Sequence, residues 1–276
     1  MIRFGPGGNS ESFYAQGYKS TYQAFKWLRD MGLDAYEYQG GKGLFIKEES
    51  ARQIGEEAGK HGIALSLHAP YFINLANNDD EKMARSFEYV EKSVQVAEWM
   101  NAGRIVIHTG SPVGQSREKA LERIIAMFGK LMELYGDRVI LCPELMGKVN
   151  QMGDLGEIIE ICNVDERILP VIDFGHLNAR TRGMLDSSKA FEDTVEALVR
   201  GIGLDRTKRM HVHFSRIEFT DMGEKRHWTE KDTQYGPDFL DFIPVIKKYG
   251  LVPVIISESA GTMAEDALWM KEMYNQ

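Results

Sequence analysis

Histidine and carboxylate side chains recur where short apolar segments of this chain end. Six of them share that position: His68, His108, Glu144, Asp173, His213 and Glu258. Imidazole nitrogens and carboxylate oxygens are ligands of zinc, and also of manganese and iron. Brought together without a cation, such groups would stand unpaired in a dry interior, which is costly. The residue types therefore predict a metal site, at which Glu258 or Glu144 also accepts a proton from water.

Two further histidines extend this set. His176 lies about one helical turn beyond the sixth apolar run, and His227 lies in a polar segment, Ser215–Tyr235, that has little helical period. His211 precedes His213 by two residues, so both side chains point to the same side of a strand. We expect His211 to lie one layer deeper, as a core residue or behind a ligand, with direct metal binding as the alternative.

Strand-like and helix-like segments alternate along the whole chain. The strand-like runs are Ile2–Phe4, Ala35–Tyr38, Ile63–His68, Arg104–His108, Val139–Glu144, Leu169–Asp173, Arg209–Phe214 and Val252–Glu258. Helical periods follow them at Thr21–Met31, Glu48–Lys60, Glu81–Met100, Arg117–Tyr135, Leu155–Cys162, Ser188–Val199, Phe239–Tyr249 and Ala264–Tyr274. Strict alternation predicts a parallel sheet, and the number of strands favours a closed barrel. We therefore predict one α/β domain, residues 1–276, folded as a single (β/α)8 TIM barrel with its site at the carboxyl ends of the strands.

The composition is that of an ordinary globular protein, with 43% hydrophobic and 27% charged residues. A net charge of −8 argues against broad adhesion to nucleic acid or membrane, although it leaves room for a local basic rim. The apolar runs have the length of strands, so we expect no membrane contact. The first residues enter a strand pattern directly, without the pattern of a signal peptide. We expect the protein to be a cytoplasmic monomer. Cys142 and Cys162 stand apart among apolar neighbours, which predicts buried thiols and no disulfide.

The segment that begins at His68, H-A-P-Y-F-I-N-L, closely resembles one in the endonuclease IV family. Members of that family are zinc-dependent barrels of the xylose-isomerase-like superfamily that cut DNA at abasic sites. The resemblance continues with H-T-G-S at His108 and with D-F-G-H from Asp173 to His176. The remaining matches fall in the family's order: Glu144, His213 and Glu258.

The resemblance implies three zinc ions on one rim. The ligand sets it implies are His68, His108 and Glu144 for one ion, and Glu144, Asp173, His213 and Glu258 for a second. The third ion would take His176, His227 and an aspartate two residues before His227, but this chain has Lys225 there. Because a protonated lysine cannot bind a cation, we predict two well-defined ions and a third that is weaker or completed differently, with manganese or iron as alternatives to zinc. Three acidic residues offer a substitute ligand: Glu224, which is the nearest, Glu218 and Asp221.

The predicted chemistry is hydrolysis of a phosphodiester. Paired divalent ions lower the pKa of a water between them towards neutrality, and the resulting hydroxide would attack phosphorus in line. The resemblance places Tyr71 and Asn74 near the nucleic acid, where they would stack on or hydrogen-bond a displaced nucleotide. Basic residues on the same face form a candidate phosphate-binding rim: Lys148, Arg180, Arg182, Arg216, Lys225 and Arg226. Arg180 and Arg216 join Tyr71 and Asn74 as the predicted substrate contacts.

Three other functions stay open at this point, the first of which is a different metal-dependent hydrolysis. Sugar isomerases and epimerases of the same fold are similar in having one manganese-type ion at positions like Glu144, Asp173, His213 and Glu258, with the two glutamates moving protons at a sugar carbon. That hypothesis gives His68, His108 and His227 no ligand role. A barrel that uses its metals only to bind a phosphate ligand is the non-enzymatic alternative. The number and kind of bound metal ions distinguish these hypotheses.

Overall fold

Eight parallel strands form the centre of the computed structural model, which describes residues 1–276. In sheet order they are β1 (Arg3–Pro6), β10 (Val254–Ser257), β7 (His211–Phe214), β6 (Val171–Asp173), β5 (Ile140–Glu144), β4 (Arg104–His108), β3 (Ala64–His68) and β2 (Ala35–Gln39). The barrel closes where β1 meets β2, because the Gly8 amide donates to the Glu37 carbonyl oxygen at 3.0 Å. A Cβ at Gly5 would lie 1.8 Å from the Ala35 carbonyl oxygen, so this approach requires glycine. The predicted (β/α)8 barrel is confirmed.

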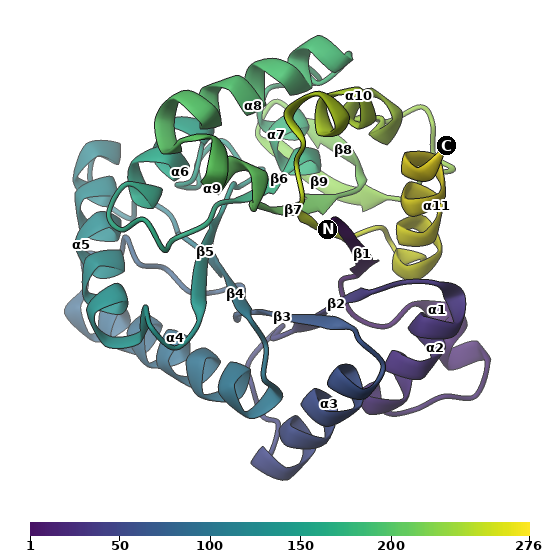
Figure 1. Ribbon diagram of the computed structural model, residues 1–276. Coiled ribbons are helices and arrows are strands. Elements are labelled where there is room, and N and C mark those ends of the chain that lie inside the picture. Colours follow the sequence, from purple (N-terminus) through teal and green to yellow (C-terminus); the bar gives the residue numbers. More distant parts are fainter.

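Helices surround the strands (Figure 1). The main ones are α2 (Ala24–Met31), α3 (Glu48–Lys60), α4 (Asp80–Met100), α5 (Arg117–Tyr135), α6 (Leu155–Cys162), α8 (Ser188–Ile202), α10 (Phe239–Tyr249) and α11 (Met263–Asn275). Shorter ones are α1 (Glu11–Ala15), the 3-10 turn η1 (Thr21–Gln23), α7 (Phe174–Arg180) and α9 (Leu204–Lys208). None of these helices has the length and apolar character needed to cross a membrane.

The apolar core lies between the strands and the outer helices. Around Phe174, for example, the rings of Phe191 and Phe242 pack at centroid distances of 4.9 and 4.5 Å. The barrel interior is more polar, because Glu37 and His211 are fully buried there. Buried polar groups of this kind persist only when they are paired, so the interior must be tied together by specific hydrogen bonds. Both cysteines are buried and unpaired, as predicted.

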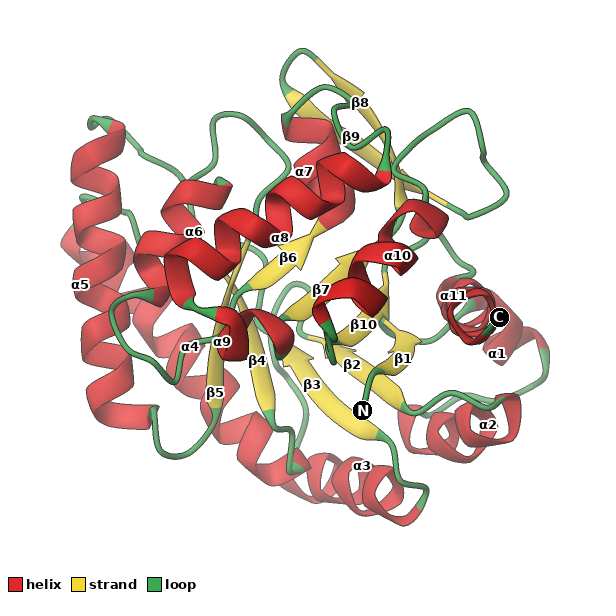
Figure 2. Cartoon of the chain, turned by 45° about the horizontal axis from the view of Figure 1, so that its top comes forward, coloured by secondary structure: helices red, strands yellow, loops and turns green.

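The polar segment after β7 folds as a hairpin rather than as an open loop. Its strands are β8 (Arg216–Thr220) and β9 (Gly223–Trp228), which pair antiparallel. The hairpin stands above the strand ends beside α7 (Figure 2). Backbone bridges join Gly223 to Lys148 in the loop after β5, and Ile217 to Gly236. These contacts fix the hairpin over the opening of the barrel, where its side chains can reach the predicted site.

Candidate metal centre

A cavity of ≈ 300 Å³ opens at the carboxyl ends of the strands. Six of the eight predicted ligands line it: His68, His108, Glu144, His176, His227 and Glu258. The other two, Asp173 and His213, are buried against them, with 1% and 0% of their surface exposed. Strand register explains the convergence, because parallel pairing places His108 beside Glu144 and Asp173 beside His213. The structure therefore brings all eight residues together.

The first group consists of His68, His108 and Glu144. Nε2 of His68 and Nε2 of His108 lie 3.2 and 3.0 Å from the same oxygen of Glu144, Oε2. The other ring nitrogens are held by backbone carbonyls, since Nδ1 of His68 lies 2.7 Å from the Ala69 oxygen and Nδ1 of His108 lies 3.1 Å from the Tyr71 oxygen. A carbonyl oxygen only accepts hydrogen bonds, so Nδ1 of each ring must be the protonated nitrogen. When neutral, both rings therefore present the lone pair of Nε2 to the cavity.

The second group shares Glu144 with the first and adds Asp173, His213 and Glu258. Nδ1 of His213 lies 3.3 Å from Oε1 of Glu144 and 3.6 Å from Oε1 of Glu258. One oxygen of Asp173 caps α7 by accepting from the His176 amide at 2.7 Å. Its other oxygen, Oδ2, is buried without a hydrogen-bond partner. Such an orphaned buried oxygen beside an imidazole and two further carboxylates fits the coordination of a divalent cation.

The third group joins His176 on α7 to Glu224 and His227 on β9. Nε2 of His176 and Nε2 of His227 face Glu224 at 3.5 and 3.8 Å. Their Nδ1 atoms are held by the Leu145 carbonyl at 3.0 Å and by the Ser215 hydroxyl at 2.8 Å. These two rings thus repeat the arrangement of the first group. Three acidic residues were candidates to replace the aspartate that is missing at residue 225, and Glu224 is the one that faces both histidines. It is suited to complete a third cation site.

A β-bulge explains why Glu224 and not residue 225 faces His227. In the hairpin, Ile217 pairs with His227 and Glu218 with Arg226, but the next residue of β8 pairs with Glu224, so Lys225 is skipped. The extra residue reverses the alternation of β9 and brings Glu224 to the face of His227. Lys225 is exposed and pairs with Glu218 instead. The departure from the D-x-H pattern is therefore compensated by backbone geometry.

The charges of the site are balanced by protons when no cation is bound. Burial opposes protonation of His68, but the hydrogen bond and charge of Glu144 outweigh it and raise the pKa of His68 to about 9. Burial also opposes protonation of His176, and the charges of Asp173 and Glu144 raise its pKa to about 9. Burial raises the pKa of Asp173 as well. A divalent cation supplies the same positive charge, so its binding would release these protons.

Tyr71 and Asn74, two of the predicted substrate contacts, differ in whether their side chains are free to contact a substrate. Tyr71 lines the cavity and is 49% exposed, so its ring remains available. Asn74 is not available, because its Oδ1 accepts from the amides of Ala76 and Ser111 and its amide donates to the Ser111 carbonyl. Instead of facing a substrate, Asn74 ties the loop after β3 to the loop after β4.

Neither predicted arginine presents a free guanidinium to the cavity. Arg180 donates to four backbone carbonyls of the loop after β5, those of Met146, Lys148, Val149 and Gln151. Arg216 is 4% exposed and is held by the Tyr235 carbonyl and by the carboxylates of Glu230 and Asp238. Both therefore stabilise loops, which corrects the expectation that they bind phosphate. From the predicted basic rim, Lys148 is the residue that lines the cavity.

Besides Gly41, four residues at or below the cavity were not anticipated as part of the site. Gln39, Gln151 and Met146 line it. Glu37 lies below it, on the inward side of β2, and contacts both His211 and His213. The sequence held no signal for Glu37, because Gln39, two residues on along the same side of the strand, was not anticipated either. His211 lies one layer deeper than His213, in contact with Glu37, as expected of a residue behind a ligand.

A family model described as the xylose isomerase-like TIM barrel matches residues 25–273. The chain belongs to this family. It is 31% identical over 262 residues to an uncharacterised protein of Methanocaldococcus jannaschii, covering 94% of this chain and 93% of that protein. It is 29% identical over 211 residues to the probable endonuclease 4 of Staphylococcus carnosus, covering 74% and 70%. The predicted resemblance to endonuclease IV is thus confirmed within the xylose isomerase-like family.

Solved structures with the same fold include enzymes of two kinds. Endonuclease IV from Thermus thermophilus superposes with a TM-score of 0.70 at 18% identity, covering 92% of this chain and 93% of that one. A D-tagatose 3-epimerase-like protein superposes with a TM-score of 0.68 at 19% identity, covering 88% and 87%. At such identities the shared feature is the fold, and the choice between these chemistries rests on the side chains of the site.

Proposed function

We propose that this protein is a metal-dependent phosphodiesterase that cleaves DNA at abasic sites. The observation that carries the proposal is the connection of three ligand groups in one cavity, with Glu144 shared by the first two. A single-ion enzyme has no use for His68 and His108 or for the group around Glu224. A centre of several cations is suited to a phosphodiester, whose reaction develops negative charge on several oxygens. Relatives named probable endonuclease 4 support the same choice.

The bound cations, zinc in our proposal, would supply an acidified water and neutralise charge on phosphate. The chain's own groups have separate tasks. Glu144 holds its two oxygens toward different imidazoles and so sets the spacing of the first two ligand groups. Glu258 is 19% exposed and faces the cavity, where it can accept a proton from the attacking water. Tyr71 offers an exposed ring on which a displaced nucleotide can stack, and Lys148 offers a positive charge to phosphate.

The test is cleavage of a duplex that carries one abasic site, with metal-loaded protein in excess. We expect cleavage by the wild-type protein, and loss of at least about 100-fold in Glu258→Gln and His108→Ala. Matched controls are Glu49→Gln and His61→Ala, which change the same residue types at the two ends of α3, away from the cavity. An intact duplex of the same sequence shows whether cutting depends on the lesion. Failure of fully metallated protein to cut the abasic strand would overturn the proposal.

A sugar isomerase or epimerase is the second candidate, favoured by one observation. Glu144, Asp173, His213 and Glu258 form a complete four-residue group by themselves. In such an enzyme the two glutamates would move protons at a carbon next to a carbonyl. Elemental analysis separates the candidates, because two or three zinc ions per chain favour the nuclease and a single manganese ion favours the isomerase.

A further inference from the structure

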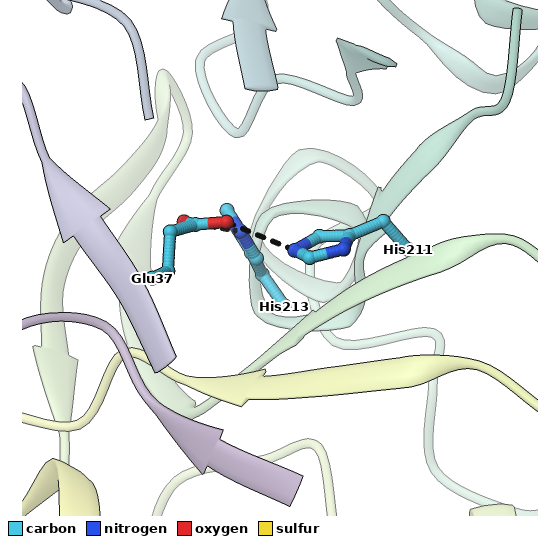
Figure 3. A group of neighbouring side chains, drawn as sticks. All are labelled: Glu37, His211 and His213. Atoms are coloured by element: carbon cyan, nitrogen blue, oxygen red, sulfur yellow. Dashed lines mark hydrogen bonds and ion pairs between the residues drawn. The ribbon is translucent and has the colours of Figure 1, made fainter. Parts of the chain in front are cut away.

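A carboxylate lies buried beneath the metal centre, between two histidines of β7. Glu37 on β2 has no exposed surface, and its side chain points toward His211 and His213 (Figure 3). Oε2 lies 2.9 Å from Nε2 of His211, and Oε1 lies 3.0 Å from Nε2 of His213. Ser66 donates to Oε2 at 2.8 Å and Gln39 to Oε1 at 3.3 Å. A charge buried this deeply is tolerated only because every nearby polar group is directed at it.

The direction of the hydrogen bonds in this cluster follows from Arg104. Its guanidinium lies 3.5 Å from Nδ1 of His211, and a guanidinium can only donate. Nδ1 of His211 must therefore carry the lone pair, so Nε2 of that ring carries the proton and donates to Glu37. The carboxylate is acceptor-only in turn, which makes Nε2 of His213 the protonated nitrogen. In the cation-free structure, Nδ1 of His213 donates to Oε1 of Glu144 at 3.3 Å, because a carboxylate only accepts. Once that proton is released to a cation, the lone pair is left on Nδ1, the atom that faces Glu144 and Glu258.

We propose that Glu37 is a positioning residue that fixes His213 to bind metal through Nδ1. The inference rests on the metal centre of the proposed function. His68, His108, His176 and His227 each direct Nε2 at a carboxylate and are hydrogen-bonded at Nδ1 to a carbonyl or a hydroxyl. In His176, Nδ1 also lies 3.3 Å from Asp173 and 3.4 Å from Glu144. His213 differs in that its Nε2 points away from the cavity, toward the buried carboxylate of Glu37, while Nδ1 faces Glu144 and Glu258. A carboxylate behind a ligating imidazole fixes its orientation and makes the metal-facing nitrogen more basic.

The contact between Glu37 and His213 is short but bent, since Nε2 of His213 lacks a well-aligned hydrogen-bond partner. A cation bound at Nδ1 of His213 would fix the orientation of the ring together with this contact at Nε2. His211 and Arg104 have no direct part in the proposed reaction. They keep the carboxylate ionised and oriented from below, so that its second oxygen stays available to His213.

The first measurement needs no variant. In zinc-loaded protein with 15N-labelled histidine, long-range 1H–15N spectra distinguish the metal-bound from the protonated nitrogen of each ring. We expect Nδ1 of His213 to be metal-bound and Nε2 protonated, with the opposite pattern for His68 and His108. A metal-bound Nε2 in His213 overturns the proposal. Cleavage of abasic DNA is measured on the same sample, so a failure of the nuclease activity is read separately from a failure of this assignment.

The second measurement uses Glu37→Gln, which keeps the shape of the side chain but loses its charge. In competition with a chromophoric chelator, we expect one zinc ion to bind about 10- to 100-fold more weakly, with the zinc-shifted signals of His68 and His108 retained. The matched control is Ser66→Ala, which removes another hydrogen bond to the same carboxylate but leaves its contact with His213, and should keep every zinc affinity. Unchanged zinc binding in Glu37→Gln, or equal weakening of every ion, would contradict the role.

Discussion

At the scale of single residues, Glu144 belongs to two ligand groups because each of its carboxylate oxygens faces a different group. Oε2 faces His68 and His108, whereas Oε1 faces His213. Pro143 precedes it at the end of β5 and the side chain is fully buried, so the carboxylate has little freedom to turn. Burial disfavours its charge, but the charge of His108 and its imidazole hydrogen bonds hold the pKa of Glu144 well below its usual range. The residue is therefore an ionised bridge.

Glu230 provides a residue-scale prediction about pH. Burial raises its pKa from 4.5 to about 7, against the opposing charge of Arg216. Between those two pH values the folded chain binds more protons than the unfolded chain at this position, so the residue makes stability fall as pH rises. We expect Glu230→Gln to be more stable relative to wild type at pH 7.5 than at pH 5, by on the order of 2 kcal/mol.

Urea unfolding at both pH values, in excess chelator, measures this difference for Glu230. The chelator keeps metal binding from adding its own pH dependence. Glu49→Gln, which neutralises an exposed glutamate on α3, is the control for the loss of a surface carboxylate. Equal stability differences at pH 5 and pH 7.5 would show that Glu230 titrates normally in the folded protein.

Residue type and strand position were enough to find the side chains that converge on the cavity, but not the roles of several neighbours. His68 and Glu144 could be predicted because imidazoles and carboxylates that end buried strands seldom serve packing alone. Asn74 and Arg180 could not be placed, because their partners are backbone groups of loops whose paths the sequence does not reveal. Glu37 was missed because it lies within a strand, where a carboxylate is recognisable as functional only once its partners on β7 are in place.

At the scale of elements, the hairpin of β8 and β9 decides whether a third cation can bind. Its bulge at Lys225 places Glu224 opposite His176. We expect Glu224→Ala to lose one ion of three per chain, or to bind it at least about 10-fold more weakly. Adding Lys225→Asp to that variant should not restore the ion, because residue 225 lies away from His227 and pairs with Glu218.

Elemental analysis after dialysis against a weak chelator would follow the metal content of these hairpin variants. Glu218→Ala is the matched control, since it removes an acidic side chain of the same hairpin that does not face the cavity. It should keep all ions. Recovery of the lost ion by Lys225→Asp would mean that the hairpin can adopt a regular register, and that the bulge does not determine the ligand.

The elements themselves were largely readable from the sequence. Alternating strand and helix periods located the eight strands and the eight main helices, with ends shifted by at most three residues. Four elements were not predicted: the short helices α1, α7 and α9 and the β8–β9 hairpin. Helix α7 begins directly after Asp173, whose side chain caps it, and is too short to show a clear period. The β8–β9 hairpin is held by bridges to Lys148 and Gly236, which are contacts between distant segments rather than local preferences.

At the scale of the whole molecule, the ligands come from segments that only the closed barrel brings together. His68 lies on β3 and Glu258 follows β10, which β2 and β1 separate around the barrel, while Glu224 and His227 come from the hairpin. The unfolded chain therefore holds no preformed site, and cation binding must favour the folded state. Without cations, the carboxylates of the centre rely on protonated imidazoles alone, as the raised pKa of His68 indicates.

Removal of the metal should accordingly lower the thermal stability of the whole barrel. A ligand at about 1,000 times its dissociation constant stabilises the folded state by about 4 kcal/mol. For a chain of this size that corresponds to a fall in Tm of roughly 8–16 °C on chelation. Differential scanning calorimetry with and without a strong chelator measures the change, and readdition of zinc should reverse it. His108→Ala should show a smaller chelator effect and His61→Ala the full effect. An identical Tm with and without chelator would mean that these side chains hold no cation in the folded protein.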